Sequence, residues 1–358
     1  MMKPAATKKL LLAPDAMVPQ RDVLLDADSM ASRISSAAAK HRLPKIDSCK
    51  IARVKYRFGT SLRVLYDVRF GGQAVKIAAR TFSPYRLTEI RQPQISAEEN
   101  LNRFPDFVDE TLGAAFWIFP NDKKIANLGT FKDIPDGLAD ISNRNWKTSR
   151  IAAYAPEKCA TAECLDANGE TIAYAKVFAG EEGCRVFEIY RALTRLDDAI
   201  PRVLNYSRPH KMLLLEAVPG VRVADMKDNS NEVYERLGAA IALFHRIPPP
   251  ANLGRANRLD PQRMPHALQT IITARPDVAF QAARLVEKLS SFSHAQGPTV
   301  SLHGDVHAKN AIWNDGKLTL IDLDQASAGD ASADIGSFLA GLHYRECVGE
   351  ISAKTRSV

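Results

Sequence analysis

The stretch SLHGDVHAKNAIWNDGKLTLIDLDQA, residues 301–326, constrains the fold of this chain more than any other part of its sequence. Two short apolar runs, AIW and LTLI, flank an Asn-Asp-Gly sequence at 314–316, which is a signal for a tight β-hairpin. Such a hairpin would fold Asp322 back beside Asn310, which itself follows Asp305 by five positions. Converging carboxylate and amide oxygens suit a hard cation such as Mg²⁺. Taken singly, these residues would be no more than turn-capping groups at strand ends.

The spacing of these three residues matches that of the catalytic loop of kinases. There, a catalytic Asp is followed after four intervening residues by Asn, and a metal-binding Asp comes just after a strand. Phosphoryl transfer needs metal ions that neutralise the phosphates, a carboxylate that orients the acceptor hydroxyl, and a lysine on the phosphate chain. The pattern therefore predicts a phosphotransferase site.

The length and composition of the chain indicate how many compact units it forms, which partners it binds and where it is located. Its 358 residues are expected to form two or three compact units. The net charge of +7 is dispersed among nearly as many acids, and we find no nucleic-acid-binding motif, so we expect no nucleic acid partner. Five cysteines without a CxxC pattern indicate reduced thiols, and the longest apolar helical run, GAAIALF, is too short for a membrane span. With no signal peptide in the N-terminal stretch, we expect a cytoplasmic protein without membrane contact.

Alternating apolar residues and turn signals predict two sets of strands separated by helices. The first set has a Gly71-Gly72 hairpin, and the second has a hairpin at Asn168-Gly169. We expect helices near 28–41, within 83–110, and over 181–196 and 231–246, and strands over 50–58, 61–70, 73–81, from 113, and over 149–155, 159–179, 200–207 and 210–218.

With HGDVHAKN followed by LIDLDQASAGDASADIGSFLAGL, the chain resembles the aminoglycoside phosphotransferase and choline kinase superfamily, which comprises small-molecule kinases with a protein-kinase-like fold. That family shows H-G-D-x-H-x-x-N, then I-D-[FW]-[DE], then G-D-x-x-x-D-[LI]. The resemblance extends back through PRVLNYSRPHKMLLLEAVPG and LGAAIALFHRIP, and so covers about residues 150–345. It implies an α+β, bilobal fold with a small antiparallel-sheet lobe and a helical C-lobe, preceded here by an α+β N-terminal domain similar to the cap of maltokinases.

The resemblance also assigns roles to residues of the catalytic loop. Asp305 resembles the catalytic base that accepts or orients the acceptor hydroxyl, and Asn310 and Asp322 resemble the Mg²⁺ ligands. Asp324 matches the second acid of the family's I-D-x-D and is expected to assist the metal or bind the acceptor. We expect His303 to pack this loop, His245 to be structural, and Asp334 to brace the loop from the start of the next helix.

In the small lobe, Lys176 resembles the phosphate-binding lysine, with Glu188 as its expected ion-pair partner. Lys76 is the rival lysine in the first strand set, and the acids at 181 and 182 are rivals of Glu188. In the hinge, the Glu216 carbonyl and the Val218 amide would meet adenine through the backbone.

Three departures, two from protein kinases and one from the small-molecule kinase family, shape the expected function. The chain has no G-x-G-x-x-G, so APEKCATAE, residues 155–163, would cover the phosphates instead. Gly304 replaces the Arg of H-R-D, and no D-F-G or A-P-E follows, which argues against a protein kinase. Only residues 335–358 follow Asp334, whereas the family usually continues with further helices, so we expect a C-lobe that is short at its C-terminus.

These features together predict the domain organisation. We expect a partly irregular N-terminal segment over 1–47, a cap-like α+β domain over 48–145, a kinase-like N-lobe ending in the hinge over 146–217, and a helical C-lobe over 218–358.

The expected function is an enzyme, a small-molecule kinase. It would use ATP, with GTP as the alternative nucleotide, and Mg²⁺ to phosphorylate a hydroxyl of a sugar, aminoglycoside or amino alcohol. The alternative is a kinase-fold scaffold or regulator that binds nucleotide with little catalysis. In either case the N-terminal domain is a candidate surface for a homodimer or a protein partner.

Overall fold

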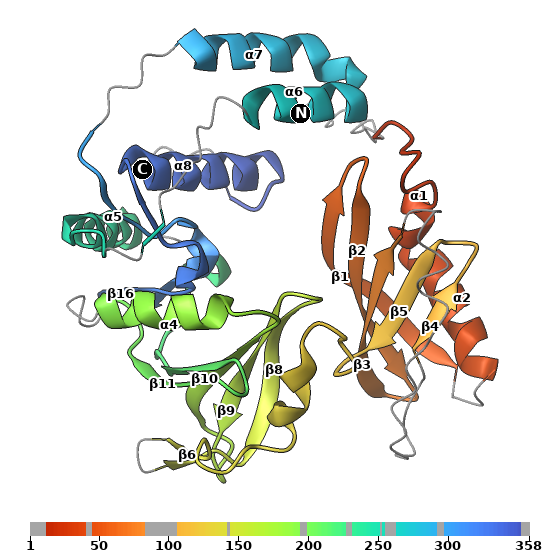
Figure 1. The fold of residues 1–358 in the computed structure, drawn as a ribbon, viewed down its shortest axis with the longest axis horizontal. Coiled ribbons are helices and arrows are strands. Elements are labelled where there is room, and N and C mark those ends of the chain that lie inside the picture. Colours follow the sequence, from red (N-terminus) through yellow and green to blue (C-terminus); the bar gives the residue numbers. More distant parts are fainter. Residues whose placement is uncertain are drawn as a thin grey trace, which may run out of the picture. The chain divides into compact units, whose positions relative to one another are not determined.

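The computed structural model of the chain describes residues 12–40, 45–82, 106–141, 144–193, 199–226, 231–250, 253–254, 263–291 and 297–351. Two compact units make up the chain (Figure 1). One consists of Met1–Asp122 and Leu259–Ser293, and the other of Lys123–Arg258 and His294–Val358. The four-part division expected from the sequence stays a prediction.

The first unit is built on a five-stranded antiparallel sheet with the order β1-β2-β3-β5-β4. Its strands are β1 (Ile46–Arg57), β2 (Ser61–Phe70), β3 (Gln73–Thr81), β4 (Phe107–Asp109) and β5 (Ala114–Ile118). The hairpin between β2 and β3 closes through Gly71 and Gly72, both with positive φ, so the predicted turn and the strands on either side of it are confirmed.

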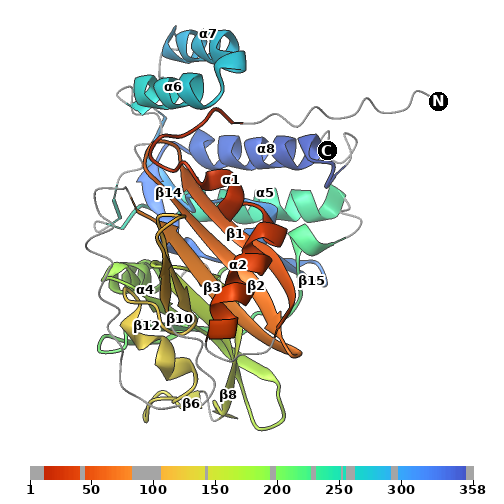
Figure 2. The same ribbon diagram turned by 90° about the vertical axis from the view of Figure 1, so that its right-hand side faces the viewer.

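Helix α2 (Ala27–Lys40) lies across one face of this sheet (Figure 2). Its buried residues Met30, Ile34 and Ala38 are spaced four apart, which is the spacing of a single helix face. They pack against buried residues of β2 and β3 such as Tyr66 and Ile77. The helix predicted near residue 28 is therefore confirmed.

The first unit also holds α1 (Arg21–Leu24), α6 (Arg263–Ala274) and α7 (Ala279–Ser291). The Ala13 N–H donates to the Ala274 carbonyl at 2.9 Å, which ties the start of the described chain to the end of α6. The helix predicted within 83–110 falls largely on residues 83–105, which lie outside the described residues.

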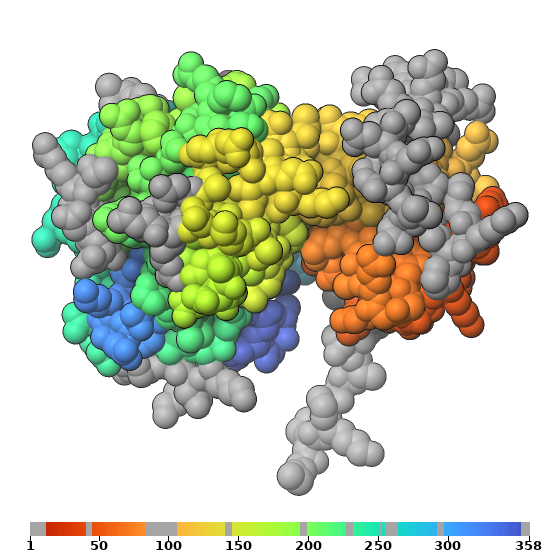
Figure 3. Space-filling view, turned by 90° about the horizontal axis from the view of Figure 1, so that it is seen from below, coloured from red at the N-terminus to blue at the C-terminus, as the bar shows by residue number. Residues whose placement is uncertain are grey.

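The second unit contains another antiparallel sheet, of the order β11-β12-β10-β9-β8. Its strands are β8 (Thr148–Ala155), β9 (Cys159–Leu165), β10 (Thr171–Phe178), β11 (Val203–Ser207) and β12 (Met212–Glu216), as the alternating pattern predicted. Helix α4 (Glu182–Ala192) follows β10, and its buried Val186, Ile189 and Tyr190 confirm the predicted amphipathic helix. In the space-filling view of Figure 3, residues of β8 and β9 (yellow-green) reach the surface.

The remainder of the second unit combines helices with short antiparallel strand pairs. It holds α5 (Asn231–Arg246), α8 (Ser332–Cys347), the strands β13 (Val221–Arg222), β15 (Ala311–Asn314) and β16 (Lys317–Leu320), and the pair β14 (Val300–Leu302) and β17 (Ser327–Gly329). The α+β, protein-kinase-like fold expected from the resemblance is thus present in this unit, and the other α+β unit consists of Met1–Asp122 and Leu259–Ser293. No helix among the described residues combines the length and the apolar character needed to cross a membrane.

One apolar core connects the elements that carry the predicted site residues. It joins α4 (Ile189), β12 (Leu213) and α5 (Phe244) to the catalytic segment through Leu320 and Leu323. Because close-packed interiors deform little, this core holds strand β10, which carries Lys176, and the segment 303–324 in a fixed arrangement.

Candidate active site

The loop after β14 brings Asp305 and Asn310 into contact. The Asn310 side-chain amide donates to the Asp305 carbonyl at 3.0 Å and approaches Asp305 Oδ2 at 3.4 Å. The Asn310 carbonyl accepts the Ile321 N–H at 2.9 Å, so Asn310 also lies beside the residue that precedes Asp322. The neighbourhood predicted from the hairpin is therefore present.

The β15–β16 turn, which brings Asn310 and the end of β16 together, has the predicted backbone form. Asp315 and Gly316 have φ of 45° and 83°, so both central residues of the β15–β16 turn are left-handed, as a type I′ hairpin requires. Asp322 also has a left-handed φ, 67°, at the point where the chain leaves β16. A non-glycine residue in this region is uncommon and is often found at functional sites.

Gly304 is required by both its conformation and its surroundings. Its φ is 82°, and a Cβ at this position would lie 2.0 Å from the Gln325 carbonyl oxygen. No other residue fits such an approach. The departure from H-R-D thus has a steric cause: the main chain before Asp305 packs directly on the loop after Asp324.

Asp334 at the start of α8 holds the same loop through hydrogen bonds. Its buried carboxylate accepts the N–H of His303 at 2.8 Å, the N–H of Gly304 at 2.9 Å, and a hydrogen bond of His245 Nε2 at 3.0 Å. Burial raises the pKa of Asp334, but these donors outweigh burial and hold the pKa below its ordinary value. The predicted bracing role of Asp334 is confirmed, and His245 is part of it.

His303 is 1% exposed, and its ring lies beside that of Phe244, with centroids 6.0 Å apart. Its Nε2 is 3.0 Å from the Ile321 carbonyl oxygen. Burial lowers the pKa of His303, so the ring is neutral at neutral pH and donates through Nε2. This residue packs the loop, as predicted.

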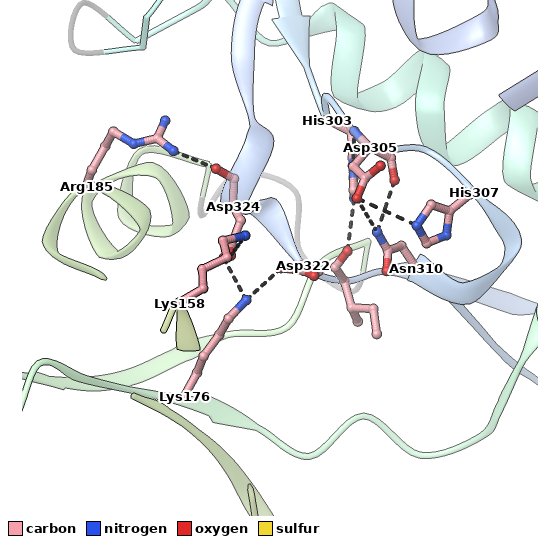
Figure 4. Close-up of polar contacts among 10 residues, drawn as sticks. Lys158, Lys176, Arg185, His303, Asp305, His307, Asn310, Asp322 and Asp324 are labelled. Atoms are coloured by element: carbon pink, nitrogen blue, oxygen red, sulfur yellow. Dashed lines mark hydrogen bonds and ion pairs between the residues drawn. The ribbon is translucent and has the colours of Figure 1, made fainter. Parts of the chain in front are cut away.

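Lys176 on β10 lies between the two carboxylates that follow β16 (Figure 4). Its Nζ is 2.7 Å from Asp322 Oδ1 and 2.7 Å from Asp324 Oδ1. The Lys176 and Asp324 side chains are only 12% and 10% exposed, whereas Asp322 is 41% exposed. The rival Lys76 instead pairs with Asp67 on the neighbouring strand of the first unit, at 2.7 Å.

The electrostatics of this cluster follow from burial and from the short distances. Burial alone would lower the pKa of Lys176, but the two carboxylates raise it well above its ordinary value. Burial raises the pKa of Asp322, but Lys176 outweighs burial and keeps it low. Burial, together with the charge of Asp322, leaves the pKa of Asp324 raised despite Lys176. Two acids of unequal proton affinity therefore share one ammonium group.

Asp305 is the more open carboxylate, with its side chain 45% exposed. The neighbouring His307, whose Nε2 lies 3.6 Å from Asp305 Oδ2, holds the pKa of Asp305 below its ordinary value, against the effect of burial. Asp305 is therefore ionised at neutral pH and accessible to a ligand.

The expected pair between Lys176 and Glu188 is not formed. Glu188 instead lies 3.7 Å from Arg191 on α4, and its side chain is 43% exposed. The reason is electrostatic, because the ammonium of Lys176 is already bound by two closer carboxylates. The sequence suggested one carboxylate partner from α4, whereas the structure provides two from the segment after β16.

A residue that sequence reasoning missed, Arg185, connects α4 to this segment. Its guanidinium donates to the carbonyl of Asp324 at 2.5 Å and approaches that of Ala326 at 3.4 Å (Figure 4). Arg185 directly precedes the buried Val186, so the helical periodicity places it at the edge of the packed face. This position at the edge of the packed face is the sequence signal that could have singled out Arg185.

The hinge residues lie at and just after the end of β12. The Glu216 carboxylate bonds Arg202, accepting the Arg202 N–H at 2.8 Å and its Nε–H at 2.7 Å. This side chain is therefore engaged by Arg202, and the Glu216 N–H also donates to the Arg202 carbonyl at 3.0 Å. Val218 is partly buried and lies beyond the last paired residue of β12.

The donor set after β16 fits a divalent cation. An ammonium group is bound there by carboxylate oxygens from two residues, so the position already accommodates a positive charge. The Asn310 amide donates through its nitrogen, which leaves its oxygen as a further hard ligand. Among the described residues no group of three or more His, Cys, Asp or Glu side chains is arranged to hold a metal.

Comparison with known families bears directly on this site. Residues 181–351 match the family model described as "Phosphotransferase enzyme family". This part of the chain is similar to that family. The matched range holds Asp305, Asn310, Asp322 and Asp324, whereas Lys176 lies five positions before it.

Solved structures of phosphotransferase family proteins are similar to the chain at low identity. The amicoumacin kinase hAmiN, in complex with AMP-PNP, Ca²⁺ and Ami, is 16% identical, with 58% of this chain and 69% of that chain covered and a TM-score of 0.44. A thermostable mutant of aminoglycoside phosphotransferase APH(4)-Ia is 15% identical, with 61% of this chain and 77% of that chain covered and a TM-score of 0.45. A choline/ethanolamine kinase family protein from Mesorhizobium loti is 13% identical, with 64% of this chain and 71% of that chain covered and a TM-score of 0.41. No curated protein matches the chain significantly.

Proposed function

We propose that this protein is an ATP-dependent small-molecule kinase that transfers the γ-phosphate to a hydroxyl group. The observation that carries the proposal is that two sets of side chains converge on Asp322 in the second unit (Figure 4). Asp305 and Asn310 meet on one side of Asp322, and Lys176 binds Asp322 and Asp324 on the other. These are the kinds of group that phosphoryl transfer from a nucleotide needs.

Asp305 is the proposed catalytic residue. Its carboxylate is ionised, partly exposed and held in place by Asn310. It would accept a hydrogen bond from the acceptor hydroxyl and so orient the oxygen for in-line attack on the γ-phosphate. Because its pKa is low, orientation of the hydroxyl rather than early proton removal is the main effect.

Lys176 is the proposed phosphate ligand. In the structure both of its hydrogen bonds go to carboxylates, so nucleotide binding would replace at least one of these contacts by a phosphate oxygen. We propose that the adenine is bound by the main chain at Glu216 and Val218, because the Glu216 side chain is engaged with Arg202. Glu188 remains a candidate partner of Lys176 only if that exchange takes place.

Asn310, Asp322 and Asp324 would hold Mg²⁺. When bound, the ion neutralises the charge that develops on the phosphates. The rest of the chain's contribution is positional: the buried Asp334 and the close packing of Gly304 on Gln325 fix the backbone from which Asp305 projects.

The proposed acceptor is a small hydroxylated molecule of the sugar, aminoglycoside or amino-alcohol type. The proposal keeps the domain division of the sequence analysis, with the N-lobe over 146–217 and the C-lobe over 218–358. The first unit remains a candidate surface for dimer or partner formation.

The experiment is a screen of hydroxylated metabolites for Mg²⁺- and ATP-dependent ADP release, followed by mass detection of the phosphorylated product. Asp305→Ala is expected to lose turnover while still binding nucleotide, because Asp305 contacts the acceptor side of the site. Asp315→Asn, in the exposed turn of the β15–β16 hairpin, is the matched control and should keep the wild-type rate.

Three results would contradict the proposal in whole or in part. If the wild type binds no nucleotide, the site assignment is wrong. If it binds nucleotide but no acceptor stimulates ADP release, the protein is a nucleotide-binding scaffold rather than a kinase. If Asp305→Ala and the wild type release ADP equally with an acceptor, Asp305 is not the catalytic residue.

A further inference from the structure

The turn between β8 and β9 is held in a fixed form, although it lacks the glycines of a phosphate-binding loop. The Lys158 N–H donates to the Ala155 carbonyl at 3.0 Å, which makes Pro156 and Glu157 the central residues of a four-residue turn. Glu157 has a φ of 62°, a conformation that a turn of this kind usually gives to glycine. The cost of a left-handed non-glycine residue is about 1–2 kcal/mol, so other contacts must stabilise the turn.

Two such contacts are present. The Glu157 carboxylate is only 9% exposed and lies 3.5 Å from Lys124 Nζ. The Ala179 N–H donates to the Lys158 carbonyl at 2.9 Å, which attaches the turn to the residue directly after β10. The main chain of Lys158 is thus fixed at the end of the strand that carries Lys176.

From this position the Lys158 side chain reaches the carboxylate cluster (Figure 4). Its Nζ lies 3.6 Å from Asp324 Oδ2, while the other oxygen of the same carboxylate binds Lys176 at 2.7 Å. Lys158 is 48% exposed, so it faces both the cluster and the solvent. Lys158 and Lys176 thus place two ammonium groups beside the Asp324 carboxylate, while Arg185 bonds the main-chain carbonyl of the same residue.

An isolated surface ion pair at 3.6 Å contributes little to stability, about 0–1 kcal/mol, so this contact does not account for the fixed turn. A half-exposed ammonium group beside carboxylates that can take up a metal is, however, suited to bind a phosphate of a polyanion. A glycine-rich loop offers main-chain N–H groups to phosphates, whereas this turn offers an ammonium group on a fixed main chain.

We infer that Lys158 is a second phosphate-binding residue, which contacts the outer phosphates of the bound nucleotide from the β8–β9 turn. The inference rests on the proposed function, because it presupposes that the cluster of Lys176, Asp322 and Asp324 binds a nucleotide. It assigns to residues 155–158 the role that a glycine-rich loop has in other kinases. The expected effect grows with the number of phosphates, since adenosine and its monophosphate would not extend to Lys158.

The test measures binding and not turnover. AMP, ADP and ATP are each titrated calorimetrically, with Mg²⁺, into the wild-type full chain and into Lys158→Ala, Lys158→Arg and Lys132→Ala. Loss of one partly exposed charge-assisted hydrogen bond should weaken ATP binding about tenfold in Lys158→Ala. AMP binding should not change, and Lys158→Arg should recover most of the ATP affinity. Lys132, an exposed lysine of the same unit, is the control for net charge.

The outcomes separate this inference from the proposed function. If the wild type binds ATP and Lys158→Ala binds it equally well, the role of Lys158 is refuted and the proposed function stands. If Lys158→Ala loses AMP and ATP affinity by the same factor, the residue supports the site as a whole and does not bind the outer phosphates. If the wild type binds none of the three nucleotides, both proposals fall.

Discussion

Asp334→Asn tests the physical basis of the catalytic loop. The substitution keeps the shape of the side chain but turns one carboxylate oxygen into an NH₂ donor. In the wild type, Oδ1 accepts the Gly304 N–H at 2.9 Å, and Oδ2 accepts the His303 N–H at 2.8 Å and the His245 hydrogen bond at 3.0 Å. An amide that keeps its oxygen at the Oδ2 position leaves the Gly304 N–H facing another donor.

The magnitude follows from this count. An unsatisfied buried donor costs about 1–3 kcal/mol. The two surviving bonds lose the assistance of the charge, which is worth roughly 1 kcal/mol more because charge-assisted bonds are about twice as strong as neutral ones. We therefore expect Asp334→Asn to lower the free energy of unfolding of the second unit by about 2–4 kcal/mol.

The assay is urea unfolding of the full chain, combined with hydrogen exchange at the amides of His303 and Gly304. Asp330→Asn is the control, since Asp330 is exposed and accepts the Ser332 N–H at 2.8 Å in the preceding turn. It should change stability by less than about 1 kcal/mol. Equal unfolding midpoints and equal exchange rates in the two variants would refute the reasoning.

The pH dependence gives an independent check of the same substitution. The folded-state pKa of Asp334 is depressed, so its contribution is present above the ordinary carboxyl pKa and is lost as pH falls through the folded-state value. The stability difference between wild type and Asp334→Asn should therefore be largest near neutral pH and should shrink in acid. A difference that grows as pH falls would contradict the assignment of the charge.

Three further predictions concern the packing and charge of the same site. Gly304→Ala should severely destabilise the second unit, because its Cβ would lie 2.0 Å from the Gln325 carbonyl at a φ of 82°; an unchanged melting temperature would disprove this. Arg185→Gln should lower kcat with little change in the ATP affinity, since Arg185 positions main-chain carbonyls, whereas the exposed Arg191→Gln should match the wild type in steady-state kinetics. Lys176→Ala leaves the neighbouring carboxylates of Asp322 and Asp324 without their cation, so their pKa values in the folded state should rise above the unfolded value. The variant should therefore lose stability in thermal unfolding, relative to wild type, as pH rises from 4 to 7. A stability difference that does not depend on pH would show that the charges are not coupled.

Local features of this protein could be predicted from the sequence because they depend on neighbouring residues. The hairpins at Gly71-Gly72 and around Asp315-Gly316 follow from residues that tolerate positive φ. The faces of α2 and α4 follow from helical periodicity. The approach of Asn310 to the end of β16 follows from the hairpin geometry, so the acidic half of the candidate site was predictable as well.

The ion-pair partners in the site were decided by tertiary structure alone. Sequence order suggested Glu188 for Lys176, but the ammonium binds Asp322 and Asp324, 146 and 148 positions away in the chain. Arg185, which the sequence did not single out, instead connects α4 to the loop that carries Asp324. The periodicity of a helix tells which face is buried, yet several charged residues lie at the edge of that face. Which of them reaches a distant loop depends on how the helix packs, to within the few ångströms over which an ion pair acts.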